Sequence, residues 1–283
     1  MSENIPREHY MDILRASRDV PLIKVLTGIR RSGKSTLLSL FRDELLQSGV
    51  PESDIFYVDL DVDRENNPTN HTELTSFVTS AIDPIPKRYI FLDEVQNVED
   101  WEISVTSFYT TGADVYITGS NSHILSSELA TKLSGRSLEI HVMPLSFSEY
   151  KTFRQPDIPI NILFHDYVVM GGMPAVAIAI DTPAKKIIPG LLSGVYTSVY
   201  VKDIEGRHKI NTSTPRMSNL VRYIMRNIGD RTSPRRTSDY LKSKGVLSEV
   251  SRILNTETCR VMDYFGYRRD LAGRGLRPLP TVG

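Results

Sequence analysis

One short stretch of this chain restricts its fold more than any other. Residues 28–35 read Gly-Ile-Arg-Arg-Ser-Gly-Lys-Ser, which matches the phosphate-binding pattern G-x-x-x-x-G-K-[ST] at each fixed position. The apolar run at residues 22–26 is typical of a buried strand, and leucines at helical spacing follow the loop. Strand, glycine-rich loop and helix N-terminus together form the anion site that such a loop needs. The sequence therefore predicts an α/β fold arranged around a phosphate-binding loop.

Each fixed position of this loop has a chemical reason. Gly28 and Gly33 let the backbone fold tightly enough for its N–H groups to surround a polyphosphate. Lys34 supplies a charge to the β- and γ-phosphates, and the Ser35 hydroxyl can ligate Mg²⁺. The predicted ligands are ATP and Mg²⁺, although the sequence does not separate ATP from GTP. The alternative is a glycine turn between two core elements. The predicted nucleotide-binding residues are Gly28, Arg30, Arg31, Ser32, Gly33, Lys34, Ser35 and Thr36.

Composition excludes several other classes of protein. The formal net charge is zero over 283 residues, so no global charge favours nucleic acid or an acidic membrane. A single cysteine, Cys259, rules out an internal disulfide framework. The N-terminus lacks the pattern of a signal peptide, and the apolar stretch 167–180 is too short to span a membrane. We expect a cytoplasmic protein with no membrane partner.

Predicted strands alternate with predicted helices through the first half of the chain. Apolar runs predict strands at 22–26, 55–60, 88–93, 114–118 and 137–142, with helical periodicity between them. This alternation is typical of a parallel sheet with helices on both faces. After Phe147 the alternation stops and the sequence becomes helical in character, which predicts a domain boundary near Tyr150.

The third predicted strand ends in two carboxylates, Asp93 and Glu94. An apolar strand that ends in acids beside a P-loop fits a Walker B motif. Asp93 would then hold the Mg²⁺ site and Glu94 would polarise the attacking water. The alternative is a strand that ends in a solvated pair of carboxylates.

Two further positions are candidates for catalysis. Asn121, or Ser120, follows the fourth strand and could orient water or contact the γ-phosphate; the alternative is a turn that caps the next helix. Arg136 precedes the fifth strand and could reach the γ-phosphate of a neighbouring subunit, or pair with a carboxylate at a helix terminus.

The motifs occur in an order that resembles a known family. They are Gly28-Ile-Arg-Arg-Ser-Gly-Lys-Ser-Thr-Leu-Leu38, Ile90-Phe-Leu-Asp-Glu-Val-Gln96, Ile117-Thr-Gly-Ser-Asn-Ser122, Gly135-Arg136, Pro144-Leu-Ser-Phe-Ser-Glu-Tyr150 and Gly171-Gly-Met-Pro174. Over residues 7–245 the chain resembles the prokaryotic AAA+-like ATPases that carry a C-terminal domain of unknown function. The resemblance implies an AAA+ α/β core, ATP with Mg²⁺, and a helical C-terminal part with a winged-helix-like segment beginning within 218–245.

The expected organisation has three parts. Residues 1–150 form the ATP-binding domain, and residues 151–254 form a helical, partly winged-helix-like domain. Residues 255–283 are Arg-, Gly- and Pro-rich at their end, so we expect a disordered or truncated tail. Basic residues in the second part permit contact with the DNA backbone, or form a solvated helical face. They are Arg222, Arg226, Arg231, Arg235, Arg236, Lys242 and Lys244.

Three functions are compatible with these features. The first is an ATPase with Lys34, Glu94, Asn121 and Arg136 as catalytic residues, in a homo-oligomer, whose hydrolysis changes the conformation of the C-terminal domain. The second is a nucleotide-gated module with little turnover that binds DNA or a protein. The third, phosphotransfer to a small molecule, is disfavoured by the acidic pair after the third strand.

Overall fold

The computed structural model divides into two compact units, Met1–Val199 and Tyr200–Gly283. It describes residues 5–62, 66–81, 88–119, 133, 135–154, 157–197, 223, 239, 267–269 and 276–278. The candidate site lies in the first unit. The boundary at residue 150 stays a prediction, because the first unit continues through the helices that follow it.

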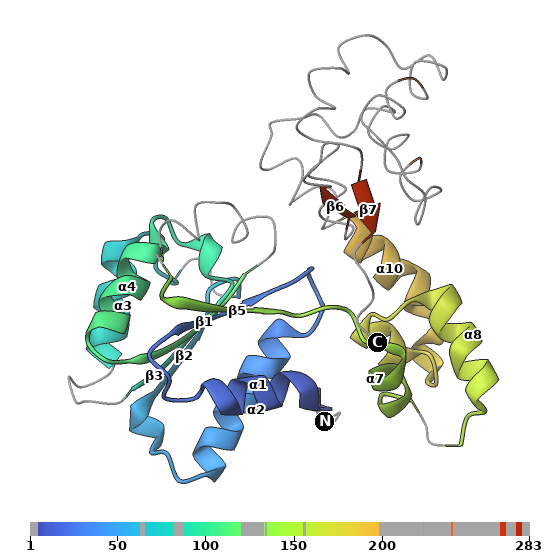
Figure 1. Ribbon diagram of the computed structural model, residues 1–283, viewed down its shortest axis with the longest axis horizontal. Coiled ribbons are helices and arrows are strands. Elements are labelled where there is room, and N and C mark those ends of the chain that lie inside the picture. Colours follow the sequence, from blue (N-terminus) through green and yellow to red (C-terminus); the bar gives the residue numbers. More distant parts are fainter. Residues whose placement is uncertain are drawn as a thin grey trace. The chain divides into compact units, whose positions relative to one another are not determined.

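A five-stranded parallel sheet forms the centre of the first unit, with strand order β2-β3-β4-β1-β5 (Figure 1). Its strands are β1 (Ile23–Thr27), β2 (Ile55–Asp59), β3 (Tyr89–Asp93), β4 (Asp114–Thr118) and β5 (Ser137–His141). Each lies within one residue of its predicted bounds. Because all five are parallel, the loops after their carboxyl ends meet at one edge, where ligands bind in such sheets.

Helices cover both faces of this sheet. The helices and short 3-10 turns of the core are α1 (Glu8–Ser17), α2 (Lys34–Gln47), η1 (Glu52–Asp54), α3 (His71–Ala81), η2 (Val95–Asn97) and α4 (Trp101–Thr110). Figure 1 shows α1 and α2 on one face, and α3 and α4 on the other. Alternate strand residues explain this arrangement, since Ile23 and Val25 pack toward α3 and α4 while Leu26 packs toward α1 and α2.

A pair of opposite charges lies inside this core. Lys24 of β1 is fully buried, and its Nζ pairs with the carboxylate of Asp114 at the start of β4 and donates to the Val20 carbonyl at 2.8 Å. The Tyr116 hydroxyl donates to the second oxygen of Asp114 at 2.8 Å. The buried ammonium and carboxylate are therefore both paired, as burial of charge requires.

After β5 the chain becomes helical. The elements are α7 (Phe147–Thr152), α8 (Ile160–Met170), α9 (Pro174–Ala179), η3 (Pro183–Ile187) and α10 (Ile188–Thr197). Buried Arg154 pairs with Asp166 at 2.9 Å and with Asp181 at 2.6 Å, which ties α7 to α8 and to the end of α9.

The Pro-Leu-Ser-Phe and Gly-Gly-Met-Pro motifs contact each other. The Leu145 N–H donates to the Gly172 carbonyl at 2.7 Å, and the Tyr167 hydroxyl donates to the Leu145 carbonyl at 2.9 Å. A Cβ at Gly172 would lie only 2.4 Å from that carbonyl oxygen, and Gly171 has φ of 79°. Two glycines are therefore required where this turn packs against the segment after β5.

The predicted α/β fold with a parallel sheet and helices on both faces is confirmed. Among the described helices none is long and apolar enough to cross a bilayer. The predicted winged-helix-like segment and the basic cluster lie outside the described residues. In the predicted tail, β6 (Tyr267–Arg269) and β7 (Leu276–Pro278) pair antiparallel. The rest of the tail is outside the described residues, so its expected disorder stays a prediction.

Candidate nucleotide-binding site

The P-loop joins β1 directly to α2. Gly28 has φ of 144°, and a Cβ there would lie 2.2 Å from the carbonyl oxygen of Val142, so only glycine fits where the loop passes the end of β5. Gly33 has φ of 101° and occupies the N-cap position of α2. In the described part of the chain no side chain caps this helix. Its first N–H groups and its dipole therefore face the position that a phosphate takes in a P-loop.

The first turn of α2 contains Lys34, Ser35 and Thr36, the last residues of the P-loop. Lys34 is buried, and its Nζ donates to the carbonyls of Gly28 at 3.0 Å and Ile29 at 3.2 Å. Ser35 and Thr36 are exposed beside it. The ammonium of Lys34 thus lies under the loop, close to where its charge would meet the β- and γ-phosphates.

The Asp93 carboxylate lies at the carboxyl end of β3 and contacts two hydroxyls. One of its oxygens accepts a hydrogen bond from Thr118 at the end of β4. The Tyr57 hydroxyl donates to its other oxygen at 3.3 Å. Burial raises the pKa of Asp93; the Thr118 and Ser35 hydrogen bonds oppose this, and the negative charges of Asp59 and Glu94 add to it.

Glu94 follows in a left-handed conformation, with φ of 54°. Its backbone N–H donates to the Thr118 hydroxyl at 2.8 Å, and its half-buried carboxylate accepts a hydrogen bond from the amide of Gln96. The unusual φ turns the chain sharply after β3, so that the carboxylates of Asp93 and Glu94 take different environments. The Asp93 carboxylate is buried against β4, and the Glu94 carboxylate is held by Gln96 in the following turn.

The middle of the loop contacts the helices that follow β5. Ile29 packs against the apolar cluster formed by α9, η3 and α10. Arg31 is exposed with φ of 64°, and a Cβ added at Gly194 of α10 would lie 3.6 Å from its Nη1. Arg30 is half-buried, and Ser32 is fully buried. The P-loop therefore lies between the sheet and the C-terminal helices of the first unit.

Arg136 lies at the opposite end of the sheet from the P-loop. Its carbonyl accepts the N–H of Ile23, the first residue of β1, at 2.8 Å, and its guanidinium lies 6.0 Å from the Tyr109 ring centre. The P-loop begins after Thr27, about 13 Å further along the strand at the usual rise per residue. This separation argues against a role for Arg136 at the nucleotide of its own chain. Asn121 and Ser120 lie outside the described residues.

Sequence reasoning missed Thr118 and Gln96 as site residues. A signal for Thr118 was available, because β3 and β4 are parallel neighbours and Leu92 is opposite Ile117. A polar residue one position further must then lie beside Asp93. Gln96 gave no such signal, because its contact with Glu94 depends on the tight turn between them.

Comparisons with known proteins give relatives for this arrangement. A family model described as an AAA domain matches residues 21–151. The chain is 32% identical over 279 residues to an uncharacterized protein of Haemophilus influenzae, covering 96% of this chain and 68% of that protein. It is 27% identical over 203 residues to the uncharacterized protein MJ1544 of Methanocaldococcus jannaschii, covering 66% of this chain and 43% of that protein.

The chain is also similar to solved structures, at low sequence identity. The ORC1 protein of Aeropyrum pernix, in a complex with DNA, is 10% identical with a TM-score of 0.43, covering 97% of this chain and 89% of that one. The family-model match contains the P-loop, all five strands of the sheet and the acidic pair after β3. This family-model match indicates nucleotide binding. The Haemophilus influenzae relative, of which the chain covers 68%, supports membership of one family. The chain belongs to the AAA+-like family of P-loop ATPases.

Proposed function

We propose that this protein binds ATP with Mg²⁺ and hydrolyses it to change the conformation of its C-terminal part. The observation that carries this proposal is the cluster at the carboxyl edge of the sheet. There Asp93 accepts a hydrogen bond from Thr118 of the neighbouring strand, and the Ser35 hydroxyl of the P-loop helix favours its charged form. A buried carboxylate beside a P-loop hydroxyl is the arrangement that phosphoryl transfer from ATP needs.

The residues present fit a magnesium ion. Mg²⁺ prefers hard oxygen ligands and retains several waters, so one hydroxyl and one carboxylate are sufficient protein partners. Ser35 and Asp93 supply these oxygens, from the first turn of α2 and from the end of β3. When bound, the ion would neutralise charge on the β- and γ-phosphates. Lys34 adds a second positive charge from below the loop.

Glu94 is the proposed general base. It follows Asp93 directly, so a carboxylate at this position can accept a proton from water approaching the γ-phosphate. The proposed role of Asn121 is to orient the same water, and that of Arg136 is to complete the site of a neighbouring subunit in a homo-oligomer. The position of Arg136 at the far end of the sheet from its own P-loop supports action in trans.

The proposed output is movement of the helices after β5. Ile29 of the P-loop packs against the apolar cluster of α9 and α10, which includes Val176 and Ile188. A change in the loop on hydrolysis would therefore alter a packed apolar contact rather than a solvent-exposed one. Apolar residues on α8 would suit a protein partner or a second subunit, since exposed patches often mark interfaces. They are Ile160, Ile162, Phe164, Val168 and Val169, all exposed.

A nucleotide-gated module that binds DNA or protein with little turnover is the second candidate. The contact between Gln96 and the Glu94 carboxylate favours it, because the amide occupies a carboxylate oxygen that would otherwise be open to the attacking water. In this version the protein alternates between nucleotide-bound and free states, and Gln96 keeps hydrolysis slow.

Steady-state ATP hydrolysis, with ATP binding measured on the same samples, tests the proposal. Glu94→Gln should lower turnover at least tenfold and leave binding intact, an effect of the size expected for loss of a general base. Glu99→Gln is the matched control, because Glu99 is an exposed glutamate five positions further along the same turn region. Binding without turnover in the wild type would favour the gated module. Absence of both binding and turnover would contradict the proposed function.

A further inference from the structure

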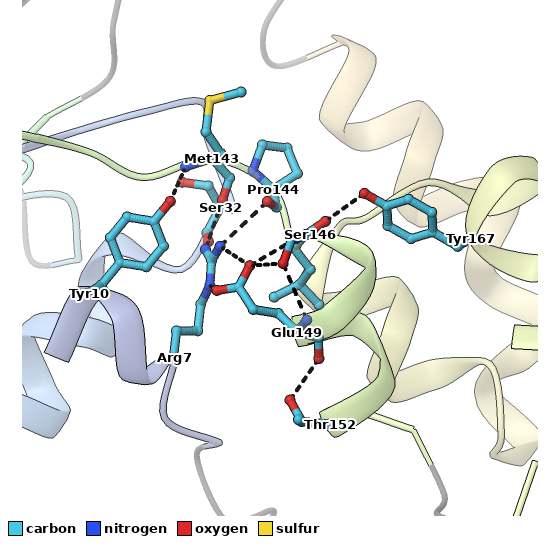
Figure 2. A network of polar contacts seen from close by, with 10 residues as sticks. Arg7, Tyr10, Ser32, Met143, Pro144, Ser146, Glu149, Thr152 and Tyr167 are labelled. Atoms are coloured by element: carbon cyan, nitrogen blue, oxygen red, sulfur yellow. Dashed lines mark hydrogen bonds and ion pairs between the residues drawn. The ribbon is translucent and has the colours of Figure 1, made fainter. Parts of the chain in front are cut away.

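Arg7, just before α1, contacts both the P-loop and the segment that leaves the sheet (Figure 2). Nη1 donates to the Ser32 carbonyl at 3.1 Å and to the Met143 carbonyl at 2.7 Å, and Nη2 donates to the Pro144 carbonyl at 3.4 Å. Nε and Nη2 donate to the two oxygens of Glu149 at 2.7 and 2.9 Å. A guanidinium has five N–H groups, and here each of them has an acceptor.

The position requires arginine rather than lysine. Arg7 is 4% exposed, so its charge is almost removed from water and needs a partner, which Glu149 provides. Three carbonyls accept the remaining N–H groups, and an ammonium has too few donors and no planar fork with which to reach all of them. Tyr10 completes the surroundings, because its ring lies 4.5 Å from the guanidinium carbon and its hydroxyl accepts the Met143 N–H at 3.0 Å.

The Ser32 carbonyl is the acceptor of Arg7 that bears on phosphate binding. In a trans peptide, the carbonyl of one residue and the N–H of the next point in opposite directions. The contact between Arg7 and the Ser32 carbonyl therefore fixes the direction of the Gly33 N–H, at the point where the loop enters α2. Gly33 has no side chain to restrain this peptide, so the restraint has to come from outside the loop.

The carboxylate of Glu149, which also accepts hydrogen bonds from Arg7, connects the P-loop to α7. Glu149 closes the capping box of that helix, because its carboxylate accepts the Ser146 N–H at 2.8 Å while the Ser146 hydroxyl accepts the Glu149 N–H at 3.3 Å. The same carboxylate accepts the fork of Arg7. One guanidinium thus joins the peptide before the P-loop helix to the N-terminus of the first helix after the sheet.

We propose that Arg7 is a positioning residue for nucleotide binding, which orients the Ser32–Gly33 peptide toward the phosphates and couples it to α7 through Glu149. This inference rests on the proposed function, because it assigns a role within the same site. Arg7 does not touch the nucleotide in this proposal. It acts by reducing the number of conformations that the empty loop can adopt, so that less ordering remains when phosphate binds.

The test compares Arg7→Met, Arg7→Lys and Glu149→Gln in the full chain. Mg·ATP affinity is measured by calorimetry at a temperature where circular dichroism shows each variant folded. Hydrogen exchange of residues 28–36 is followed without nucleotide. Arg7→Met should weaken ATP binding about tenfold, since hydrogen bonds to a charged group contribute on that order, and should increase exchange in the loop. Arg7→Lys and Glu149→Gln should give smaller effects in the same direction.

Arg15→Met is the matched control. Arg15 is likewise an arginine at α1 with several acceptors, the carboxylates of Glu8, Asp12 and Glu44, but it lies at the surface and none of these acceptors is a P-loop carbonyl. Loss of Arg15 should lower thermal stability without changing ATP affinity or exchange in the loop. If Arg7 had only a structural role, Arg7→Met would likewise lower thermal stability and leave ATP affinity and loop exchange unchanged.

The outcomes separate the inference from the function on which it rests. A folded Arg7→Met protein with wild-type ATP affinity overturns the positioning role. If Arg7→Met does not fold, Arg7→Lys and Glu149→Gln decide the question by the same measurements. If the wild type binds no ATP, the proposed function fails and so does a role in nucleotide binding. Exchange of residues 28–36 that increases in the Arg7 and Glu149 variants but not in Arg15→Met would still support the orientation of the loop by Arg7.

Discussion

The hydroxyl of Thr118 donates a hydrogen bond to the carboxylate of Asp93 across two adjacent parallel strands. The same hydroxyl accepts the backbone N–H of Glu94 at 2.8 Å. Thr118 therefore contacts both residues of the acidic pair from one atom, and it holds the carboxylate of Asp93 and the backbone of Glu94 in place.

Thr118→Val should lower ATP turnover about tenfold, because it removes a positioning contact whose loss misplaces the proposed metal ligand and base. Without the hydroxyl, the pKa of Asp93 rises further above its ordinary value, so less of the metal-binding anion is present at a given pH. Turnover measured at increasing Mg²⁺ concentration checks this. Thr118→Ser keeps the hydroxyl and should stay close to wild type; equal losses in both variants would contradict the explanation.

Stability at acidic pH should depend on Glu149. Burial raises the pKa of this carboxyl, but the Arg7 fork and the Ser146 hydrogen bonds outweigh burial, so the pKa falls below its usual range. A carboxyl with a lowered pKa stabilises the fold above the unfolded pKa, near 4.3, and this contribution disappears as the pH falls through the folded value. Urea unfolding should show a difference between wild type and Glu149→Gln that is constant near pH 7 and decreases below about pH 4.3. A difference that grows on acidification would show that the sign is wrong.

The buried pair of Lys24 and Asp114 gives a prediction on stability alone. Lys24→Met should reduce the free energy of unfolding by about 3 kcal/mol, because the carboxylate of Asp114 remains buried without its counter-ion. Adding Asp114→Asn removes that charge and keeps an acceptor for the Tyr116 hydroxyl. The double variant should therefore be more stable than Lys24→Met, as denaturant titration would show; additive losses would mean that the pair is not coupled.

The two motifs that meet after the sheet allow a comparison between glycines. Gly172→Ala should cost about 1–3 kcal/mol of unfolding free energy, because its Cβ would lie 2.4 Å from the Leu145 carbonyl oxygen. Gly190→Ala, in α10, meets nothing within 4 Å and should stabilise by about 0.5 kcal/mol through helix propensity. Thermal unfolding of both variants provides the measurement. A similar change in both would show that backbone entropy, rather than the close approach, sets the cost.

Arg136 should act across a subunit interface if it acts in catalysis. Arg136→Ala alone and Glu94→Gln alone should both have low turnover, because each lacks one part of the site. Mixing the two variants should restore partial activity, since some interfaces then combine an intact Glu94 with an intact Arg136 from a neighbour. Hydrolysis measured over a range of mixing ratios checks this, with Lys151→Ala, an exposed basic residue of α7, in place of Arg136→Ala as a control. Activity that is simply the average of the two samples would argue against a shared site.

The strands and the P-loop could be predicted because their signal is local. Residues 89–92 are apolar without interruption, and a strand buried on both faces leaves that pattern whatever its neighbours are. Lys24 interrupts the first run, yet the strand forms, because its ammonium meets a carboxylate from a distant part of the chain. That pairing has no sequence signal of its own.

The supporting residues of the site could not be found in the same way. Three of the acceptors of Arg7 are backbone carbonyls, which every residue carries, so the sequence gives no indication of which ones it contacts. The clearest side-chain clue was Glu149, which fits a capping box with Ser146 and so already had a local explanation. Its second partner, 142 positions away, depends on how the chain folds back on itself.

The strand order has a topological consequence. β5 is both the last strand of the sheet in sequence and its edge strand, and it pairs with β1, from which the P-loop emerges. The chain therefore leaves the sheet one strand spacing from the nucleotide loop. The segment that follows β5 therefore begins beside the P-loop. A change of sequence or length in the later helices would leave that junction in place. Different C-terminal domains could therefore respond to the same nucleotide-dependent change in the P-loop without any change in the sheet.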